Sequence, residues 1–452
     1  MKTISVRTPC GFIRGMELDG CFSFRGIPYA KPPINELRFA PPEEHNPFSE
    51  EYDATHYRNI AMQTPNPRIL RAIDDLGRGE QTVQSEDCLY LNITTCSVDN
   101  GKRPVLIYIH GGANLGGYSY SAMQDPEYLV KKGKIVFVSV DFRTGIFGFL
   151  YHPFLNTDIL NTSDCLASIH WIYKNITAFG GNPDNITLIG QSSGAHNIVD
   201  IIASNKARGL IKNAVIQSAS FGRGCFSPRQ AIQKAEMLFK MLEIYPEKGN
   251  LREQLARYSS KELTQISTEY ATVFLNSDEW GYQWGAVHDG CEEPAASAMI
   301  QGFRAARNGI RIIVGHTENE AGSFRPYMPE FGPYETERVF AKHLYIYAGT
   351  VNSCGGKAWA YNFGWYPEGS KYKACHCIDQ PFVYGTWNTM RSSRIFTNGD
   401  EIQAERLIKD FSGDILSLMY NGYPQDRNWE QYTSENTSYK YYDGFGNPIR
   451  KR

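Results

Sequence analysis

The residue whose surroundings point most directly to chemistry is Ser192. It is the centre of Gly190-Gln191-Ser192-Ser193-Gly194, which follows the apolar run ITLI and precedes the helical pattern AHNIVDIIAS. A serine on a tight turn between a strand and a helix is held in a strained conformation, and small residues on either side let the helix approach the strand. The helix N-terminus also favours negative charge that forms nearby. We therefore predict that Ser192 is a nucleophile, and the alternative is a Gly/Ser-rich turn without chemistry.

A second glycine-containing loop could supply donors for an oxyanion. His110-Gly111-Gly112-Ala113 follows the apolar run VLIYI at 105–109. Acyl transfer needs preorganised N–H groups, usually one from the residue after the nucleophile and others from an earlier loop. We expect these donors to be the backbone N–H groups of Gly112, Ala113 and Ser193. The alternative is a loop in which the glycines only mark a turn.

A serine nucleophile also needs a base, and the base needs an acid that orients it. With this kind of nucleophile turn the chain order is serine, acid, histidine. Glu320 comes six residues after the apolar run that ends at 314, and Glu318 is a rival acid. Only His343 and His376 follow Glu320. His343 lies in FAKHLYIYA, which reads as a helix interior, whereas His376 lies in a loop beyond the last expected strand, so we predict Glu320 and His376.

The neighbours of His376 raise the question of a metal site. Cys375-His376-Cys377 has a single residue between its cysteines. Structural zinc sites usually have two to four residues between paired cysteines and need four ligands. We therefore expect no metal and no organic cofactor.

The elements that position these residues follow from short apolar runs that alternate with helical patterns. Runs without polar alternation are typical of strands that are buried on both faces. The sequence predicts strands at 105–109, 135–140, 186–189, 214–216, 311–314 and 357–363. It predicts helices at 163–176, with Ser163 or Asp164 as the cap, and after Ser192. This order predicts an α/β fold with a central, mostly parallel sheet flanked by helices.

The remaining organisation is simple. The stretch from about 222 to 310 is rich in helical patterns, of which residues 229–245 are the clearest, and reads as an insertion over the sheet. We find no repeat, low-complexity tract or Pro-rich linker. The expectation is one domain over residues 1–452 with a helical insertion.

Composition excludes several classes of protein. The 452 residues carry a formal net charge of −2, which argues against binding to nucleic acid or a membrane surface. Hydrophobic residues make up 42% and charged residues 21%, as in ordinary globular proteins. No apolar run is long enough to cross a bilayer, and the start of the sequence has no signal-peptide pattern. We therefore expect a cytoplasmic protein, and in that reducing compartment the ten scattered cysteines read as free thiols.

Taken together, the motifs resemble those of the type-B carboxylesterases, a family of carboxylesterases, cholinesterases and some lipases. The similarity extends over nearly the whole chain. The motifs that carry it are FRGIPYAKPP with LRF (24–39), SEDCLYLN (85–92), IHGGA (109–113), VDFRTGIFGFL (140–150), NITAFGGNPDNITLIGQSSGA (175–195), IQSAS (216–220), HDG (288–290), GHTENEAGSF (315–324) and ACHCIDQPFVYG (374–385). The resemblance implies the α/β-hydrolase fold and hydrolysis of carboxylic esters. It also implies Ser192 as nucleophile, Glu320 as acid and His376 as base.

The chain departs from the family pattern at three positions. Ala61 stands where a cysteine would pair with Cys88, so we expect the family's N-terminal disulfide to be absent. Gln191 replaces the usual acidic residue before the nucleophile, which weakens the case for a cationic substrate. Asn114 replaces a common aromatic residue and predicts a more polar acyl pocket.

These observations lead to one hypothesis about function. The chain is expected to be a serine carboxylesterase that forms an acyl-enzyme and acts on small-molecule esters, with short-chain or aryl esters favoured. An amide, thioester or carbamate substrate stays open, as does a neuroligin-like binding role without catalysis. We expect a monomer or a small homo-oligomer.

Overall fold

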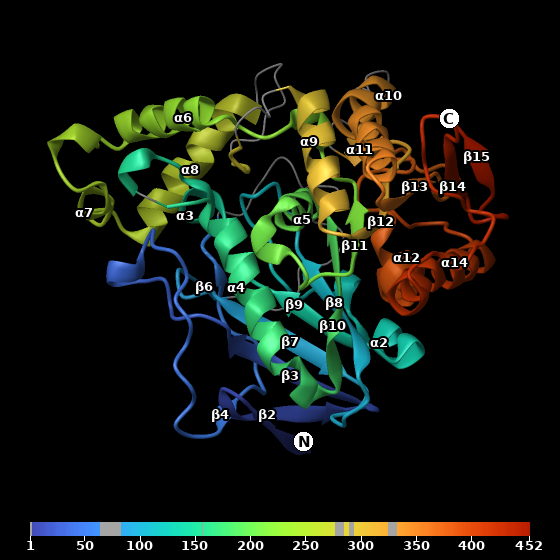
Figure 1. Cartoon of the computed structure of the whole chain (residues 1–452), viewed down its shortest axis with the longest axis horizontal. Helices are drawn as coiled ribbons and strands as arrows, with labels where there is room; N and C mark the ends of the chain where they lie inside the picture. The colour runs from blue at the N-terminus through green and yellow to red at the C-terminus, as the bar shows by residue number, and fades with distance from the viewer. Residues whose placement is uncertain (1, 64–82, 156, 276–283, 289–292, 324–331) are drawn as a thin grey trace.

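The computed structural model describes residues 2–63, 83–155, 157–275, 284–288, 293–323 and 332–452. Within these residues a thirteen-stranded mixed sheet runs through the molecule, and helices lie on both of its faces (Figure 1). The strand order is β1-β2-β3-β7-β9-β8-β10-β11-β12-β13-β14-β15, with β4 paired to β2. The expected α/β architecture with a central, largely parallel sheet is therefore confirmed.

The centre of the sheet is parallel from β9 to β14. Its strands are β8 (Arg103–Ile109), β9 (Val136–Val140), β10 (Gly181–Gln191), β11 (Asn213–Gln217), β12 (Arg311–Thr317), β13 (Lys357–Phe363) and β14 (Ser438–Tyr442). In parallel strands the carboxyl ends meet at one edge, so the loops after β8, β10, β12 and β13 converge there. These are the loops that carry every residue expected at the site.

Antiparallel strands extend the sheet at both ends. One end is formed by β1 (Thr3–Thr8), β2 (Gly11–Leu18), β3 (Cys21–Pro28) and β7 (Tyr90–Thr95), and the other by β15 (Ile449–Lys451). The short β4 (Tyr52–Asp53) joins β2, while β5 (Ile60–Ala61) and β6 (Gln84–Ser85) form a separate pair. The outer strands are partly exposed, in contrast to the fully buried β9 and β11.

Alternate residues of each central strand enter separate hydrophobic cores. Val105, Ile107 and Ile109 belong to the core that contains residues of α4 (Leu160–Asn175), α5 (Ser193–Ala203), α9 (Pro294–Arg307) and α11 (Lys342–Ser353). Leu106 and Tyr108 belong to the core that contains residues of α2 (Glu127–Gly133), α12 (Gln380–Tyr384), α13 (Trp387–Met390) and α14 (Glu401–Asn421). Burial on both faces is the physical reason why these strands are continuous apolar runs.

The stretch at 222–310 contains α6 (Pro228–Met241), α7 (Leu251–Leu255), α8 (Ser260–Leu275) and α9. Helices α6 to α8 form the arm at the upper left of Figure 1, and they share a third core with α3 (Gly145–Phe149). Helix α10 (Gly332–Glu335) and a π-helical turn (Thr336–Ala341) lead into α11. That the chain is one domain with an insertion at about 222–310 stays a prediction.

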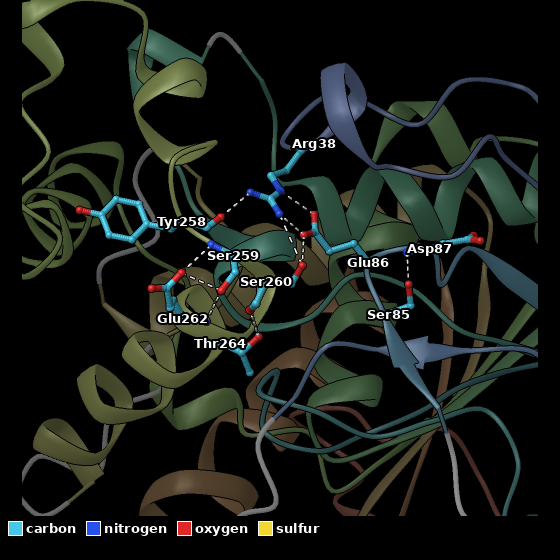
Figure 2. A network of polar contacts seen from close by, with 9 residues as sticks. All are labelled: Arg38, Ser85, Glu86, Asp87, Tyr258, Ser259, Ser260, Glu262 and Thr264. Atoms are coloured by element: carbon cyan, nitrogen blue, oxygen red, sulfur yellow. Dashed lines mark hydrogen bonds and ion pairs between the residues drawn. The ribbon is translucent and has the colours of Figure 1, made fainter.

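A buried polar network ties α8 to the N-terminal part of the chain (Figure 2). The Arg38 guanidinium donates to Glu86 Oε2 at 2.8 Å and to the Tyr258 carbonyl at 2.8 Å. The Ser260 hydroxyl donates to the other oxygen of Glu86. Glu86 is buried, so this carboxylate and Arg38 fix the start of α8 against the body of the molecule.

One expectation about a helix boundary is wrong. Ser163 and Asp164 do not cap α4, because the helix begins at Leu160 and Ile159 is its N-cap. Asp164 is instead fully buried and accepts hydrogen bonds from Arg143 Nε at 2.8 Å and Nη2 at 2.6 Å. A strong ionic partner on another element therefore determines the position of this carboxylate, rather than the helix end.

The predicted free thiols are partly tested. Cys88 is a buried free thiol, which confirms that the N-terminal disulfide is absent, and the described cysteines other than Cys225 are free thiols as well. Cys291 lies outside the described residues. Among those residues, none of the helices combines the length and the apolar composition that crossing a bilayer requires.

Candidate active site

Ser192 stands at the junction of β10 and α5. Its φ of 61° and ψ of −129° put it in a conformation that is strained for any residue other than glycine. Its N–H donates to the Gln217 carbonyl of the neighbouring strand at 2.9 Å. The strained turn after a buried strand, with a helix starting at the next residue, is the arrangement predicted for a nucleophile.

The glycines on either side of Ser192 are required by close packing. A Cβ atom at Gly194 would lie 2.2 Å from the Ile109 carbonyl oxygen, and one at Gly190 would lie 2.8 Å from the same oxygen. Ile109 is the last residue of β8, which pairs with β10. Only glycine lets α5 start this close to the neighbouring strand, so the pattern of the motif has a steric cause.

The loop after β8 lies against the nucleophile. A Cβ atom at Gly111 would lie 3.1 Å from Ser192 Cβ. Gly112, Ala113 and Asn114 follow with φ values of 131°, 58° and 60°, so two residues with side chains adopt a backbone that favours glycine. Such successive turns direct backbone N–H groups to one side. That Gly112, Ala113 and Ser193 supply oxyanion donors stays a prediction.

Asn114 holds this loop to both the nucleophile helix and the insertion. Its N–H donates to Ser193 Oγ at 3.2 Å, and its side-chain amide donates to the Trp284 carbonyl at 2.8 Å. Asn197 of α5 donates to its Oδ1 at 3.2 Å. Asn114 is 5% exposed, so its polar side chain is used for internal hydrogen bonds. Whether the acyl pocket is more polar than usual stays a prediction.

The structure brings Glu320 and His376 into direct contact. Glu320 opens the short helix η8 (Glu320–Ser323) after β12, and His376 lies in the loop between β13 and α12. One Glu320 oxygen is hydrogen-bonded to His376 Nδ1, and the other accepts the Thr317 N–H at 2.8 Å. Both side chains are almost completely buried. Backbone pairing of Asn319 with Cys375 holds the two loops together.

The surroundings keep Glu320 ionised. Burial alone would raise the pKa of Glu320, but the attraction and hydrogen bond of His376, with contributions from Ser218 and Thr317, lower it below the ordinary value. A carboxylate in this position fixes the imidazole with its proton on Nδ1 and leaves Nε2 as the basic atom.

The rival residues lie elsewhere. Glu318 is exposed, and its side chain accepts a hydrogen bond from Tyr441 at 3.1 Å. His343 lies within α11, as its helical pattern indicated. Glu320 and His376, the preferred acid and base, are therefore the pair whose side chains are in contact, whereas the rivals Glu318 and His343 lie elsewhere.

Two side chains at the site were not predicted from the sequence. Gln191 Nε2 lies 3.0 Å from His376 Nε2, and because Nδ1 faces Glu320, the amide donates to the lone pair of Nε2. The sequence had indicated only a lost negative charge at Gln191. Its position directly before the nucleophile was the signal that could have revealed this contact.

The second is Asp379, three residues after His376. It is fully buried and accepts hydrogen bonds from Gln217 at 3.0 Å and Tyr361 at 3.2 Å. Burial, with the nearby charge of Glu320, raises the pKa of Asp379 to about 6. This second carboxyl behind the site carries a proton more readily than Glu320 does.

Comparison with known proteins identifies the family. The family model described as the carboxylesterase family matches residues 2–345. This chain belongs to the carboxylesterase family. The para-nitrobenzyl esterase of Bacillus subtilis is 27% identical over 95% of this chain and 93% of its own length. A probable N-octanoylanthranilate hydrolase of Rhodococcus erythropolis is 30% identical over 86% of this chain and 87% of its own length.

Solved structures agree with the fold of a carboxylesterase. A carboxylesterase of Geobacillus stearothermophilus superposes with a TM-score of 0.82 at 26% identity, covering 99% of this chain and 97% of the other. A PNB esterase superposes with a TM-score of 0.85 at 24% identity, covering 99% and 96%. The fold is thus the α/β-hydrolase fold, and the protein is a carboxylic ester hydrolase.

Proposed function

We propose that this carboxylesterase hydrolyses esters through an acyl-enzyme formed on Ser192, with His376 as general base and Glu320 as the acid that orients it. Three features support the proposal. They are the strained Ser192 at the end of β10, the buried contact of Glu320 with His376 Nδ1, and the position of His376 Nε2 beside the residue that precedes Ser192. The contact between Glu320 and His376 carries most of the weight, because it joins two loops far apart in the sequence.

The chemistry follows in two halves. His376 takes the proton of the Ser192 hydroxyl while the Ser192 oxygen attacks the ester carbonyl. The N–H groups of Gly112, Ala113 and Ser193 stabilise the oxyanion that forms. His376 returns the proton to the departing alcohol. Water then attacks the acyl carbonyl and gives a proton to the same imidazole. The bond between the acyl group and the Ser192 oxygen breaks, that oxygen takes the proton back from His376, and the acid leaves. The mechanism uses neither a metal nor an organic cofactor.

For the substrate we propose small esters with a short acyl chain or an aryl alcohol. The name of the para-nitrobenzyl esterase, with which this chain aligns over most of its length, supports an aromatic alcohol group. A panel of 4-nitrophenyl esters of increasing acyl length, run beside the matched anilides, tests this preference. Faster turnover of long acyl chains or of the anilides would contradict it.

The triad is tested by pairing each proposed residue with its rival. Ser192→Ala and His376→Ala should lower kcat on 4-nitrophenyl acetate by about a thousand-fold or more, and Glu320→Gln should cost up to about 10⁴ because the imidazole loses its orientation. His343→Ala and Glu318→Gln are the matched controls and should retain kcat. Near-normal turnover of either serine or histidine variant, or an equal loss in a control, would refute the assignment. An organophosphate should label one peptide, the one that contains Ser192.

We also propose a cytoplasmic location and a monomer or small homo-oligomer, with no nucleic-acid or membrane partner. The described cysteines other than Cys225 are free thiols, which supports a reducing compartment. Light scattering of the purified chain tests the oligomeric state, and an assembly larger than a tetramer would contradict it.

A further inference from the structure

A second group of chemically active side chains lies one helical turn beyond Ser192. His196 and Asp200 are four residues apart on α5, and Cys225 follows the short helix η6 (Phe221–Arg223). All three are buried, and one possible ligand atom of each lies within 4.8 Å of the others. Residues at i and i+4 share one face of a helix, so His196 and Asp200 face the same point.

His288 adds a fourth group to this cluster. Its Nε2 lies 3.4 Å from Asp200 Oδ1, and its side chain is 29% exposed. The backbone brings His288 to Cys225, because the N–H of Phe226 donates to the Ala286 carbonyl and the N–H of His288 donates to the Phe226 carbonyl, each at 2.9 Å. Cys225 and His288 are therefore neighbours through main-chain pairing, independently of any contact between their side chains.

Two distances in the cluster match those expected between the ligands of a tetrahedral metal ion. Zinc bonds of about 2.0 to 2.3 Å at tetrahedral angles separate the ligand atoms by about 3.3 to 3.8 Å. Cys225 Sγ lies 3.8 Å from Asp200 Oδ1, and His288 Nε2 lies 3.4 Å from the same oxygen. The possible ligand atoms of His196, Asp200 and Cys225 all lie within 4.8 Å of one another.

One nitrogen of the cluster makes no hydrogen bond with the surrounding described residues. Among the residues that the structure describes, Nδ1 of His196 is buried without a hydrogen-bond partner, and His196 is 6% exposed. A buried polar atom without a partner destabilises the folded state. A metal ion bound through this nitrogen would give it a partner.

Neighbouring side chains hold the ligands in place. Gln301 of α9 donates to Asp200 Oδ1 at 2.6 Å and lies 3.2 Å from Cys225 Sγ. Ser297 Oγ lies 3.5 Å from the same sulfur. Metal ligands in proteins are usually oriented by such outer hydrogen bonds. Ionised Asp200 and a Cys225 thiolate would together balance the charge of a divalent cation.

We propose that His196, Asp200, Cys225 and His288 bind a divalent transition metal of the zinc class. Imidazole and thiolate ligands favour zinc over magnesium or calcium, which prefer oxygen. Four protein ligands make a closed site, so the metal is structural and takes no part in ester hydrolysis. It would fasten the first turns of α5 to the segments around 225 and 288. The sequence-based expectation of no metal referred to the triplet around His376 and missed this cluster.

Cobalt substitution provides the direct test. The full-length wild-type protein is freed of metal by a chelator and titrated with Co²⁺. We expect one equivalent to bind with a near-ultraviolet thiolate-to-cobalt band, and Zn²⁺ to displace it. Cys225→Ser should abolish the band and weaken zinc binding about 100-fold or more. Cys354→Ser is the matched control, because Cys354 is an exposed free thiol, and it should leave both unchanged.

Further variants keep the test decisive if Cys225→Ser does not fold. His288→Gln changes a partly exposed residue and should weaken zinc binding about 10-fold or more while the cobalt–thiolate band persists at higher Co²⁺. Saturating zinc should raise the melting temperature of the wild type more than that of His288→Gln. A wild type without a thiolate band would overturn the proposal. So would zinc affinity that is unchanged in His288→Gln, or a band that survives in folded Cys225→Ser.

Discussion

Replacing Gln191 with glutamate puts a charge where the structure has a neutral amide. Gln191 Nε2 lies 3.0 Å from His376 Nε2, and the two residues are 6% and 1% exposed. A carboxylate at this position would attract the protonated imidazole, which is the form that cannot accept the Ser192 proton. We expect Gln191→Glu to move the acid limb of the kcat/KM profile to higher pH.

The size of the shift follows from the separation of the charges. Unit charges about 4 Å apart interact by about 1 kcal/mol in water and about 4 kcal/mol at an effective dielectric constant of 20. One pH unit corresponds to about 1.4 kcal/mol, so these limits give shifts of about 0.7 and 3 units. The new carboxylate is itself buried and resists ionisation, which reduces the effect. We therefore expect an upward shift of about 1 to 2 units.

The assay is kcat/KM on a neutral 4-nitrophenyl ester between pH 5 and 9, which reports groups of the free enzyme. Gln191→Met is the matched control, because it keeps the side-chain length and removes the hydrogen bond without adding charge. The acid limb of its kcat/KM profile should lie at the same pH as that of the wild type, even if the maximal kcat/KM changes. If the limb of Gln191→Glu coincides with that of Gln191→Met, Gln191 does not face the base and the reasoning fails.

Three further predictions concern stability. Arg143→Met leaves the buried carboxylate of Asp164 unpaired and should cost about 3 to 5 kcal/mol in urea denaturation, whereas a loss below 1 kcal/mol would show that the pair is dispensable. Gly194→Ala would place a Cβ 2.2 Å from a carbonyl oxygen of β8 and should lower the melting temperature and organophosphate labelling, whereas Gly349→Ala in α11 meets no atom within 4 Å and should retain both. Burial raises the pKa of Asp141 to about 7, so the folded state holds a proton that the unfolded state loses near pH 4, and stability from this group falls as pH rises from about 4 to 7. Asp141→Asn should remove that part of the fall, and parallel stability–pH curves for the two proteins would contradict it.

How far the sequence determines the fold depends on the burial of each strand. The predicted strand at 357–363 coincides with β13, and the runs at 135–140 and 214–216 lie within one residue or so of β9 and β11. Strands β9 and β11 and the middle of β13 are buried, and each contains a mainly apolar run. Strand β7 has the sequence YLNITT, which mixes polar and apolar residues, and no local pattern predicted it. Its Asn92 is buried and donates to Ser119 at 2.9 Å, which is a long-range contact.

At the proposed site, local sequence was informative wherever the geometry is local. Steric limits on adjacent residues determine the turn around Ser192, so the five-residue motif at 190–194 and the flanking strand and helix patterns were enough to predict it. Glu320 and His376 were selected by chain order and by elimination. Their contact depends on the pairing of Asn319 with Cys375, which no periodicity in either loop encodes.

The cluster around Cys225 shows the same limit more sharply. Two of its members, His196 and Asp200, stand at helical spacing directly after the nucleophile, and that spacing was visible in the sequence. The other two, Cys225 and His288, come together because the backbone at 226 pairs with that at 286–288. A single sequence holds no signal for that pairing, since the intervening helices could return the chain to the sheet in several ways. A structure is therefore most informative for clusters whose residues are brought together by pairing between distant loops, because sequence motifs do not reveal those contacts.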